Sequence, residues 1–457
     1  MEIKKGIYLV FGAGKSGVAA AALLKEHGAD VVLYDGNAGL DIAAVSAKLA
    51  DRTARSEEIR VIAGELPDAV KKEIVCAVLS PGIPTDLPLV EELRSNGAEI
   101  SGEVEIAYRL GRGKVYAVTG TNGKTTTTTL LGELMKAVHE KVDVVGNIGD
   151  PYADIADKQT DETVTVIEMS SFQLETIEEF HPQAAVITNI TEDHMNRHHT
   201  MENYIRCKKN IVKNQTENDC CILNYEDEVL RDFAKDVPSE VVFFSSVREL
   251  EKGLYLKDGS IVFNDGADIR EIVKTEDLQI VGLHNYENAM AAAAAALYDG
   301  MEVSDIRRVL QEFKGVEHRI EYVGEFDGVR YYNDSKGTNP AAAIHGIAAM
   351  KGPTLLIAGG YDKQSSYEEW IDTFGDKVYR LVLIGQTKEK IAEAAGRCGF
   401  PAERVVMCED LKEAVEYCKK NAGAGSEVLL SPACASWDQF DSYEQRGDLF
   451  KEYVREK

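Results

Sequence analysis

The chain lacks the features that mark zinc-ribbon, secreted and membrane proteins. None of its eight cysteines forms a Cys-x-x-Cys pair, which argues against a zinc ribbon and a thioredoxin-type motif. The longest apolar run is the alanine-rich stretch 289–297, far shorter than the roughly 20 residues that cross a bilayer. The first residues carry no apolar stretch of signal-peptide length. We therefore expect a soluble cytoplasmic protein with free thiols and no membrane partner.

Positive charge is also scarce, because 51 Lys and Arg residues stand against 77 Asp and Glu residues and the formal net charge is −26. Nucleic-acid binding needs a basic surface, so we expect no nucleic-acid partner. The sequence has no low-complexity linker and no convincing repeat. At roughly 150 residues per domain, its 457 residues correspond to about two to four domains.

Strand-like and helix-like segments alternate along most of the chain. Apolar strands are expected at 7–11, 31–34, 75–79, 115–118, 164–167, 185–188, 330–332, 354–358, 381–384 and 427–430. Such βαβ alternation predicts parallel sheets with ligand sites at the carboxyl ends of the strands. We predict an α/β protein of three consecutive α/β domains: a Rossmann-like domain (1–105), a P-loop ATPase-like domain with a mostly parallel sheet (106–315) and a second Rossmann-like domain (316–457). The stretch 221–272 is expected to be a hairpin-rich excursion whose role the sequence does not give.

The most informative segment is VYAVTGTNGKTTTTTL at 115–130. A strand, a glycine turn and a helix start together bring backbone N–H groups, the helix dipole and a lysine to an anion. The run is a shortened P-loop, because the first glycine of G-x-x-x-x-G-K-[ST] would fall at Val118. The residues predicted to bind ATP phosphates are Gly120, Thr121, Asn122, Gly123, Lys124, Thr125 and Thr126. The Thr125 hydroxyl stands where a P-loop hydroxyl binds Mg²⁺.

Acidic and histidine side chains follow the next strands. Glu168 ends the strand 164–167, where a Walker-B acid would reach Mg²⁺; a surface salt bridge is the alternative. His194 follows the strand 185–188. It has the i, i+4 spacing of zinc ligands with His198, but no third ligand is apparent. We favour His194 as a ligand of a second Mg²⁺ and expect His198 and His199 to be ordinary loop residues.

Two adjacent lysines, Lys208 and Lys209, follow Tyr204 on the next helix. Their residue type alone predicts solvated surface charges, and spacing does not choose between them.

Near the start of the chain, the motif Gly12-Ala-Gly14-Lys-Ser-Gly17 follows a strand and precedes Asp35. This pattern is typical of dinucleotide sites, in which the acid binds a ribose hydroxyl. NAD is one interpretation, and glycine-mediated helix packing is another. Since a second nucleotide loop follows at 120, we favour another phosphorylated or nucleotide-linked ligand.

In the last third of the chain, His318-Arg319 and the segment NDSKGTNP at 333–340 flank the strand 330–332. Two cations and one acid near a strand end form a plausible clamp for phosphate charge. Lys363 and Ser436 follow other strands, and an ammonium and a hydroxyl at such positions suit a carboxylate substrate.

Together these segments resemble the ATP-dependent Mur ligase family. The matching motifs, in chain order, are TGTNGKTTT, GNIG, EMSSFQLE, NITEDHM, GLHNYENAMAA, VEHRIE and NDSKGTNP. Within the family, GAGKSG with Asp35, SPGIP at 80–84 and SPACASWDQFDSYEQRG at 431–447 are most similar to the branch that joins D-glutamate to UDP-N-acetylmuramoyl-L-alanine. The resemblance implies an acyl-phosphate mechanism in cytoplasmic peptidoglycan precursor synthesis. We expect the chain to act as a monomer on these small-molecule substrates.

The resemblance also assigns roles to individual residues. It implies ATP with two Mg²⁺ ions, held by Thr125, Glu168, His194 and a carbamylated lysine, which is Lys208 by its spacing from Tyr204. Lys124, His194, Lys208 and Lys336 are then catalytic. Further ATP contacts are implied for Asn288, Arg319 and Asp334. The implied uridine-nucleotide contacts are Gly14, Lys15, Ser16, Asp35, Gly36, Ser80, Gly82 and Asn147. The implied D-glutamate contacts are Thr338, Lys363, Ser436 and Tyr443.

Three other functions remain open at this point. A sister Mur-type ligase or a folylpolyglutamate synthetase would share Lys124, Glu168 and Lys336 but differ around Lys363 and Ser436. A nucleotide-switched regulator would need no amino-acid pocket, and an NAD-linked enzyme would use the glycine motif at 12–17.

Overall fold

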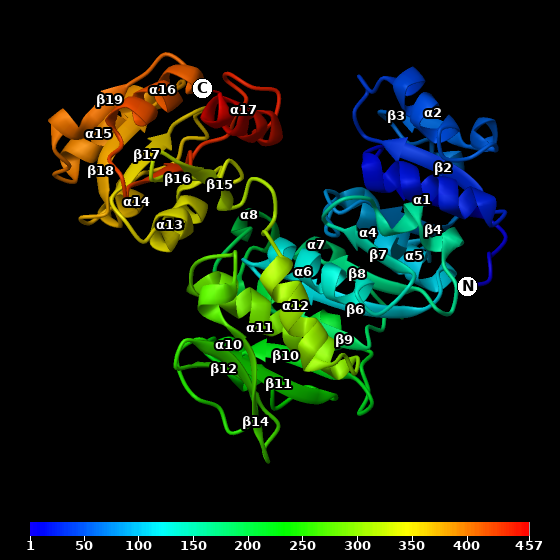
Figure 1. Ribbon diagram of the computed structural model, residues 1–457. Helices are drawn as coiled ribbons and strands as arrows, with labels where there is room; N and C mark the ends of the chain where they lie inside the picture. Colours follow the sequence, from blue (N-terminus) through cyan, green and yellow to red (C-terminus); the bar gives the residue numbers. More distant parts are fainter. Residues whose placement is uncertain (457) are drawn as a thin grey trace. The chain divides into compact units, whose positions relative to one another are not determined.

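The computed structural model describes residues 1–456 and forms three β-sheets within that range (Figure 1). The sheets follow one another along the chain without sharing strands, and parallel pairs predominate in each. This arrangement confirms the predicted fold class of three consecutive α/β parts.

The first sheet is parallel and alternates with helices. Its strands are β1 (Ile7–Phe11), β2 (Asp30–Asp35), β3 (Arg60–Ala63), β4 (Ile74–Leu79) and β5 (Glu99–Gly102). Its helices are α1 (Lys15–Glu26), α2 (Ile42–Ala50), α3 (Asp68–Lys71), α4 (Pro88–Ser95) and α5 (Glu103–Leu110). The strand order β3-β2-β1-β4-β5 changes direction between β1 and β4. Ligands bind at such a switch point, and both the glycine motif and the 80–84 loop lie there.

The second sheet carries the glycine-rich loop 120–123, called the phosphate loop below because it is predicted to bind phosphate. Its strands are β6 (Lys114–Thr119), β7 (Val142–Gly146), β8 (Val164–Glu168), β9 (Ala184–Ile187), β10 (Cys220–Asn224), β11 (Glu240–Ser245), β12 (Gly253–Lys257), β13 (Ser260–Asn264) and β14 (Ile269–Lys274). Its helices are α6 (Lys124–Lys136), α7 (Ser171–Leu174), α8 (Met195–His198), α9 (Met201–Lys209), α10 (Glu228–Phe233), α11 (Leu283–Tyr298) and α12 (Val303–Glu312). The order β10-β9-β6-β8-β7 puts β6 at the centre. The antiparallel strands β12, β13 and β14 form one edge, as the hairpin-rich excursion predicted.

The third sheet has one antiparallel edge. Its strands are β15 (Glu321–Phe326), β16 (Val329–Asn333), β17 (Thr354–Ala358), β18 (Val378–Leu383), β19 (Val405–Met407) and β20 (Glu427–Leu430). Its helices are α13 (Pro340–Ala349), α14 (Glu368–Asp372), α15 (Lys388–Arg397), α16 (Leu411–Asn421) and α17 (Tyr443–Arg455). Neighbouring residues of β17 enter different cores: Leu356 packs with Trp370, and Leu355 packs with Phe450. Because successive side chains of a strand point to opposite faces, helices cover both faces of this sheet.

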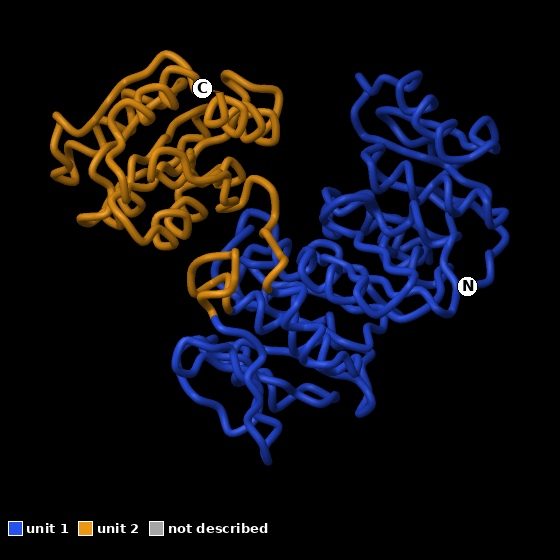
Figure 2. Tube along the Cα trace, in the orientation of Figure 1, with its two compact units in different colours: residues 1–274, 287–310 blue, residues 275–286, 311–457 orange. Residues whose placement is uncertain are grey.

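The chain divides into two compact units (Figure 2). One comprises residues 1–274 and 287–310, with the first two sheets, and the other comprises residues 275–286 and 311–457. Inside the first unit, α1 and α5 pack on the short turn Tyr152–Asp154. The domain boundaries near 105 and 315 stay predictions. Among the described residues, no helix has the length and apolar character to span a bilayer.

Candidate active site

The loop between β6 and α6 requires glycine at two positions. Gly120 has φ +144° and Gly123 has φ +83°, values that L-residues with side chains rarely adopt. A Cβ on Gly120 would lie 1.9 Å from Thr188 Oγ1, and one on Gly123 would lie 2.3 Å from Asn288 Oδ1. The backbone therefore approaches its neighbours too closely for any side chain, and the loop closes around the start of α6.

Lys124 begins α6 and folds back over this loop. Its Nζ donates hydrogen bonds to the carbonyl oxygens of Gly120 at 2.9 Å and Thr121 at 2.8 Å. The threonines that follow Lys124 on α6 are candidates for a structural role as well as for phosphate binding. Thr127 Oγ1 bonds to Asn288 Oδ1, and Thr125 and Thr126 are buried at the helix N-terminus. The arrangement fits a triphosphate, because the lysine and the helix N-terminus offer positive charge at one place.

Glu168 ends β8 beside this loop, since Val118 of β6 pairs with Glu168 in the parallel register. The carboxylate is 1% exposed. Asn147 Nδ2 donates to its Oε1 at 2.8 Å, whereas Oε2 is buried without a hydrogen-bond partner. An unpartnered buried carboxylate oxygen is costly unless something satisfies it. A hard divalent cation is the natural partner, so Glu168 fits the expected Mg²⁺.

Lys208, not Lys209, lies at the phosphate loop. Lys208 is 1% exposed, and its Nζ donates to the Gly120 carbonyl at 2.7 Å and lies 4.7 Å from the Tyr204 ring centre. Burial, and then the charge of Lys124, hold the pKa of Lys208 well below its usual range. The Nζ of Lys209 lies over Phe233 instead. The surface role predicted from residue type alone is therefore wrong for Lys208.

His194 precedes α8 in the loop after β9, with a left-handed φ of 56°. Its imidazole is half-exposed, and its Nε2 lies 3.4 Å from Asp193 Oδ2.

His198, expected to be an ordinary loop residue, is instead the buried last residue of α8. Its Nε2 bonds to Ser171 Oγ at 2.9 Å, and burial lowers the pKa of His198 to about 4. The Phe172 ring contacts both imidazoles.

At the switch point of the first sheet, Asp35 organises the glycine turn. Its Oδ2 accepts from Ala13 N, and its Oδ1 accepts from Asn37 N, both at 3.0 Å. Ser80 Oγ donates to the Gly12 carbonyl. Lys15 reaches Asp150 Oδ1 at 3.0 Å. The carboxyl edge therefore brings together the glycine motif, Asp35 and the 80–84 loop, although Asp35 and Lys15 are engaged by protein groups.

In the other unit, Asp334 and Lys336 follow β16. Asp334 is buried and accepts a 2.7 Å hydrogen bond from Ser431 Oγ. Burial raises the pKa of Asp334 to about 7. Lys336 Nζ lies 5.6 Å from the ring centre of Tyr443, the first residue of α17. Lys336, predicted to be catalytic, and Tyr443, predicted to contact D-glutamate, are thus neighbours.

Two of the expected amino-acid contacts, Lys363 and Ser436, follow β17 and β20, which are adjacent strands, whereas Thr338 lies just before α13 and Tyr443 begins α17. Tyr361 N donates to the Ala435 carbonyl at 2.9 Å, and this bond joins the two loops. Lys363 Nζ lies 5.1 Å from the ring centre of Trp437, whose side chain is 64% exposed. Ser436, which precedes Trp437 in the sequence, is buried.

Sequence reasoning missed Arg446, which holds this part of the site together. The guanidinium is fully buried and donates to Ser335 Oγ and to the carbonyl oxygens of Ser335, Cys434 and Ala435. Its position in the matched segment 431–447 was the available signal. Asn147 was expected near the sugar of the substrate, and its bond to Glu168 was not anticipated.

Comparison with known proteins identifies the family. A family model described as "Mur ligase middle domain" matches residues 118–296, and one described as "Mur ligase, glutamate ligase domain" matches residues 318–434. The chain belongs to the Mur ligase family. This Mur ligase is 53% identical over 446 residues to the UDP-N-acetylmuramoylalanine–D-glutamate ligase of Lachnoclostridium phytofermentans, which covers 98% of this chain and 97% of the relative. It is 47% identical to the protein of the same name from Lachnospira eligens, with 99% of both chains covered.

Solved structures show the same fold. The Acinetobacter baumannii MurF structure aligns with a TM-score of 0.60 at 15% identity and covers 100% of this chain and 94% of that chain. The Thermotoga maritima UDP-N-acetylmuramate-alanine ligase MurC aligns with a TM-score of 0.58 at 17% identity and covers 98% of both chains. As a Mur ligase, the protein is an ATP-dependent enzyme that forms an amide bond.

Proposed function

We propose that this Mur ligase joins D-glutamate to the L-alanine carboxylate of UDP-N-acetylmuramoyl-L-alanine, using ATP, in peptidoglycan precursor synthesis. The observation that carries the proposal is identity of 53% and 47%, across nearly the whole chain, to two ligases that are named for this reaction. A different Mur-type amino acid is the alternative, and the pocket near Lys363 and Ser436 is where it would differ.

The reaction takes place in two steps, phosphoryl transfer and then amide formation. A carboxylate oxygen of the nucleotide substrate attacks the γ-phosphorus of ATP, the bond between the β–γ bridging oxygen and that phosphorus breaks, and ADP leaves. The amine of D-glutamate then attacks the acyl phosphate, loses a proton, and displaces inorganic phosphate as the amide forms. Phosphorylation comes first because a carboxylate is a poor electrophile until it carries a leaving group.

The residues of the first unit would serve the phosphoryl step. The turn 120–123, Lys124, Thr125 and Thr126 would bind the phosphates, with Asn288 supporting the loop through its contact with Thr127. Lys124 would exchange its bonds to Gly120 and Thr121 for phosphate oxygens. Mg²⁺, when bound by Thr125, Glu168, His194 and Lys208, would neutralise charge that builds up on the phosphates. Removing Lys124 would take away one of the positive charges that compensate this negative charge.

We further propose that Lys208 is carbamylated. A carbamate converts an ammonium into a carboxylate-like oxygen ligand, which suits a lysine beside a metal. The support is positional: Lys208 is buried against the phosphate loop, and Lys209 faces Phe233.

For the substrates, we propose a uridine-nucleotide site over Gly14, Lys15, Ser16, Asp35, Gly36, Ser80 and Gly82, with Asn147 near the sugar. In the other unit, Arg319, Asp334 and Lys336 would serve ATP. The D-glutamate contacts would be Thr338, Lys363, Ser436 and Tyr443. The substrates are small molecules, and we propose that the enzyme acts on them as a cytoplasmic monomer.

Phosphate release tests the assignment. With ATP, Mg²⁺ and UDP-N-acetylmuramoyl-L-alanine, we expect release on adding D-glutamate but not L-glutamate or L-lysine. Equal release with L-lysine would overturn the amino-acid assignment. Lys124→Ala should lose at least ~100-fold in kcat, whereas Lys136→Ala, at the far end of the same helix and paired with Glu133, should retain activity.

A further inference from the structure

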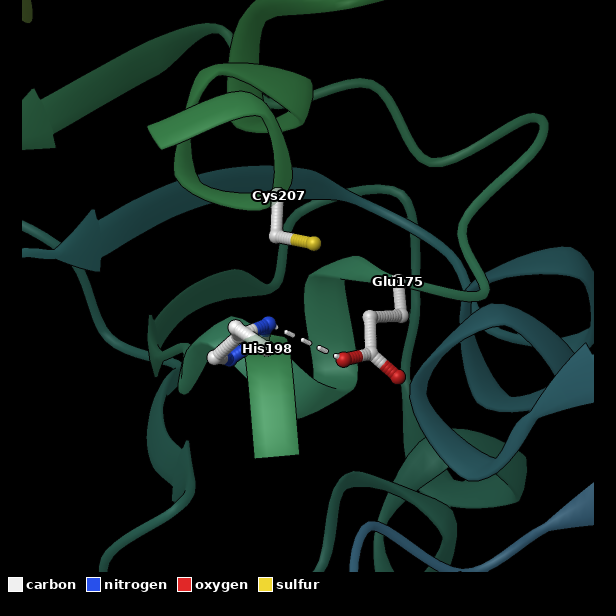
Figure 3. Close-up of side chains that lie close together, drawn as sticks. All are labelled: Glu175, His198 and Cys207. Carbon is white, nitrogen blue, oxygen red and sulfur yellow. Dashed lines mark ion pairs between the residues drawn. The ribbon is translucent and has the colours of Figure 1, made fainter. Parts of the chain in front are cut away.

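Three potential metal ligands from different elements converge within the first unit (Figure 3). They are Glu175, directly after α7, His198 at the end of α8 and Cys207 on α9. Their ligand atoms all lie within 4.8 Å of one another. Figure 3 shows the Cys207 sulfur and a His198 nitrogen directed into the space that a Glu175 oxygen also faces. His198 Nδ1 lies 3.4 Å from Glu175 Oε1.

Neighbouring residues bind one polar atom of His198 and one of Glu175, so that the other polar atom of each side chain faces the space between the three ligands. His198 Nε2 is engaged by Ser171 Oγ at 2.9 Å, so Nδ1 is the nitrogen that faces the cluster. Arg197 Nη2 donates to Glu175 Oε2 at 2.8 Å, so Oε1 is the oxygen that faces it. Metal-ligating histidines commonly have the second nitrogen held in this way, because the partner fixes ring orientation and tautomer.

The donor set selects the kind of ion. Thiolate, imidazole and carboxylate are ligands of Zn²⁺, whereas Mg²⁺ prefers oxygen alone. At Zn–N and Zn–O distances of about 2.0–2.1 Å, a tetrahedral ion separates these donors by roughly 3.3 Å, close to the 3.4 Å between Nδ1 and Oε1. Three protein ligands leave the fourth position for water.

We propose that Glu175, His198 and Cys207 form a binding site for a thiophilic divalent cation such as Zn²⁺, separate from the Mg²⁺ expected at Glu168. On binding, the Cys207 sulfur forms a bond to the metal and its thiol proton leaves to solvent. The ion ties together α7, α8 and α9. His194 is the residue before α8, and Lys208 is the residue after Cys207. An ion bound here would therefore also hold in place the segments that carry these two proposed Mg²⁺ ligands.

Cobalt provides a direct test with the full-length protein. The metal-free protein is titrated with Co²⁺ in excess Mg²⁺ and without nucleotide, and thiolate-to-cobalt charge-transfer absorption is followed in the near ultraviolet. We expect one equivalent of Co²⁺ to produce this absorption, Zn²⁺ to abolish it by displacement, and binding to release a proton. The expected Mg²⁺ ligands contain no sulfur, so this signal is specific to Cys207 among the two sites.

Variants separate the site from other thiols. Cys207→Ala and His198→Gln should lose the absorption, and Zn²⁺ should no longer raise their melting temperature. Cys76→Ala removes another buried cysteine of the same unit and should behave like the parent protein. The proposal is overturned if the parent protein gives no charge-transfer band, or if the band persists in Cys207→Ala. Circular dichroism confirms that each variant is folded, and His198→Gln provides an independent test should Cys207→Ala fail to fold.

Discussion

Side chains near the phosphate loop gain their properties from burial more than from residue type. Lys208 is an ordinary lysine by composition, yet it is enclosed by Gly120, Tyr204 and the chain around them. Since burial disfavours an ammonium, its pKa falls well below the usual range. A neutral amine is the form that attacks CO₂, so this environment makes Lys208 suitable for carbamylation.

Labelling with ¹³C-bicarbonate measures this modification. We expect a carbamate resonance in the parent protein and in Lys209→Ala, because Lys209 lies over Phe233, and we expect it to be absent in Lys208→Ala. Activity lost in Lys208→Ala should be partly restored by short carboxylic acids that supply the missing oxygen ligand. A resonance that survives in Lys208→Ala would contradict the assignment.

At the level of elements, the β6–loop–α6 unit depends on the backbone of Gly123. An alanine there must adopt a left-handed conformation, which costs about 1–2 kcal/mol, and its Cβ would stand 2.3 Å from Asn288 Oδ1. Gly300 also has a positive φ of 91°, but a Cβ there meets no atom within 4 Å. We expect Gly300→Ala to lower the melting temperature modestly without changing ATP affinity.

Gly123→Ala should instead weaken ATP binding at least ~10-fold, because the loop must move to accommodate the methyl group. Calorimetric titration with a non-hydrolysable ATP analogue compares the two variants. Similar nucleotide affinity in both would show that the loop geometry is not what binds the phosphates.

Elements with a strong local signal could be predicted from the sequence. The ranges of β1, β17 and β20 match the expected strands, because apolar runs end there at Gly or Ser. Helix boundaries are less well marked: α1 begins at Lys15, inside the glycine motif, with Gly14 as its N-cap. The last residues of the glycine motif at 12–17 therefore already belong to the helix.

The site was predictable where a motif is contiguous, as at 120–126. It was not predictable where contacts depend on packing between distant elements. The bond from Asn147 to Glu168 joins the ends of β7 and β8, and the burial of His198 results from α7, α8 and α9 packing together. No local pattern distinguishes a buried histidine from an exposed one in a loop-rich segment.

At the scale of the whole molecule, a buried acid joins the first sheet to the second. Glu103 begins α5, and its Oε1 accepts from Ala153 N at 2.7 Å, while Oε2 is buried without a partner. Burial raises the pKa of Glu103 from 4.5 to about 7. The folded state therefore binds this proton more tightly than the unfolded chain does.

Protonated Glu103 makes the stability of the protein depend on pH. The contribution of Glu103 to the free energy of unfolding is fully present below pH 4.5. It is lost as the pH rises towards 7, at up to about 1.4 kcal/mol per unit of pH. Glu103→Gln keeps an acceptor oxygen but cannot ionise. We expect the melting temperature of the parent protein, relative to this variant, to decrease between pH 5 and pH 7.5. A constant difference across that range would contradict the raised pKa.

The two tryptophans of the chain occupy opposite environments: Trp370 is enclosed in the third-sheet core, and Trp437 is exposed beside Lys363. Their fluorescence should therefore be separable, with blue-shifted emission from the enclosed indole and red-shifted, iodide-quenchable emission from the other. The molecule thus carries its own optical probe of the loop on which amino-acid selection is proposed to depend. Ligand occupancy there becomes measurable in real time, without a label and independently of turnover.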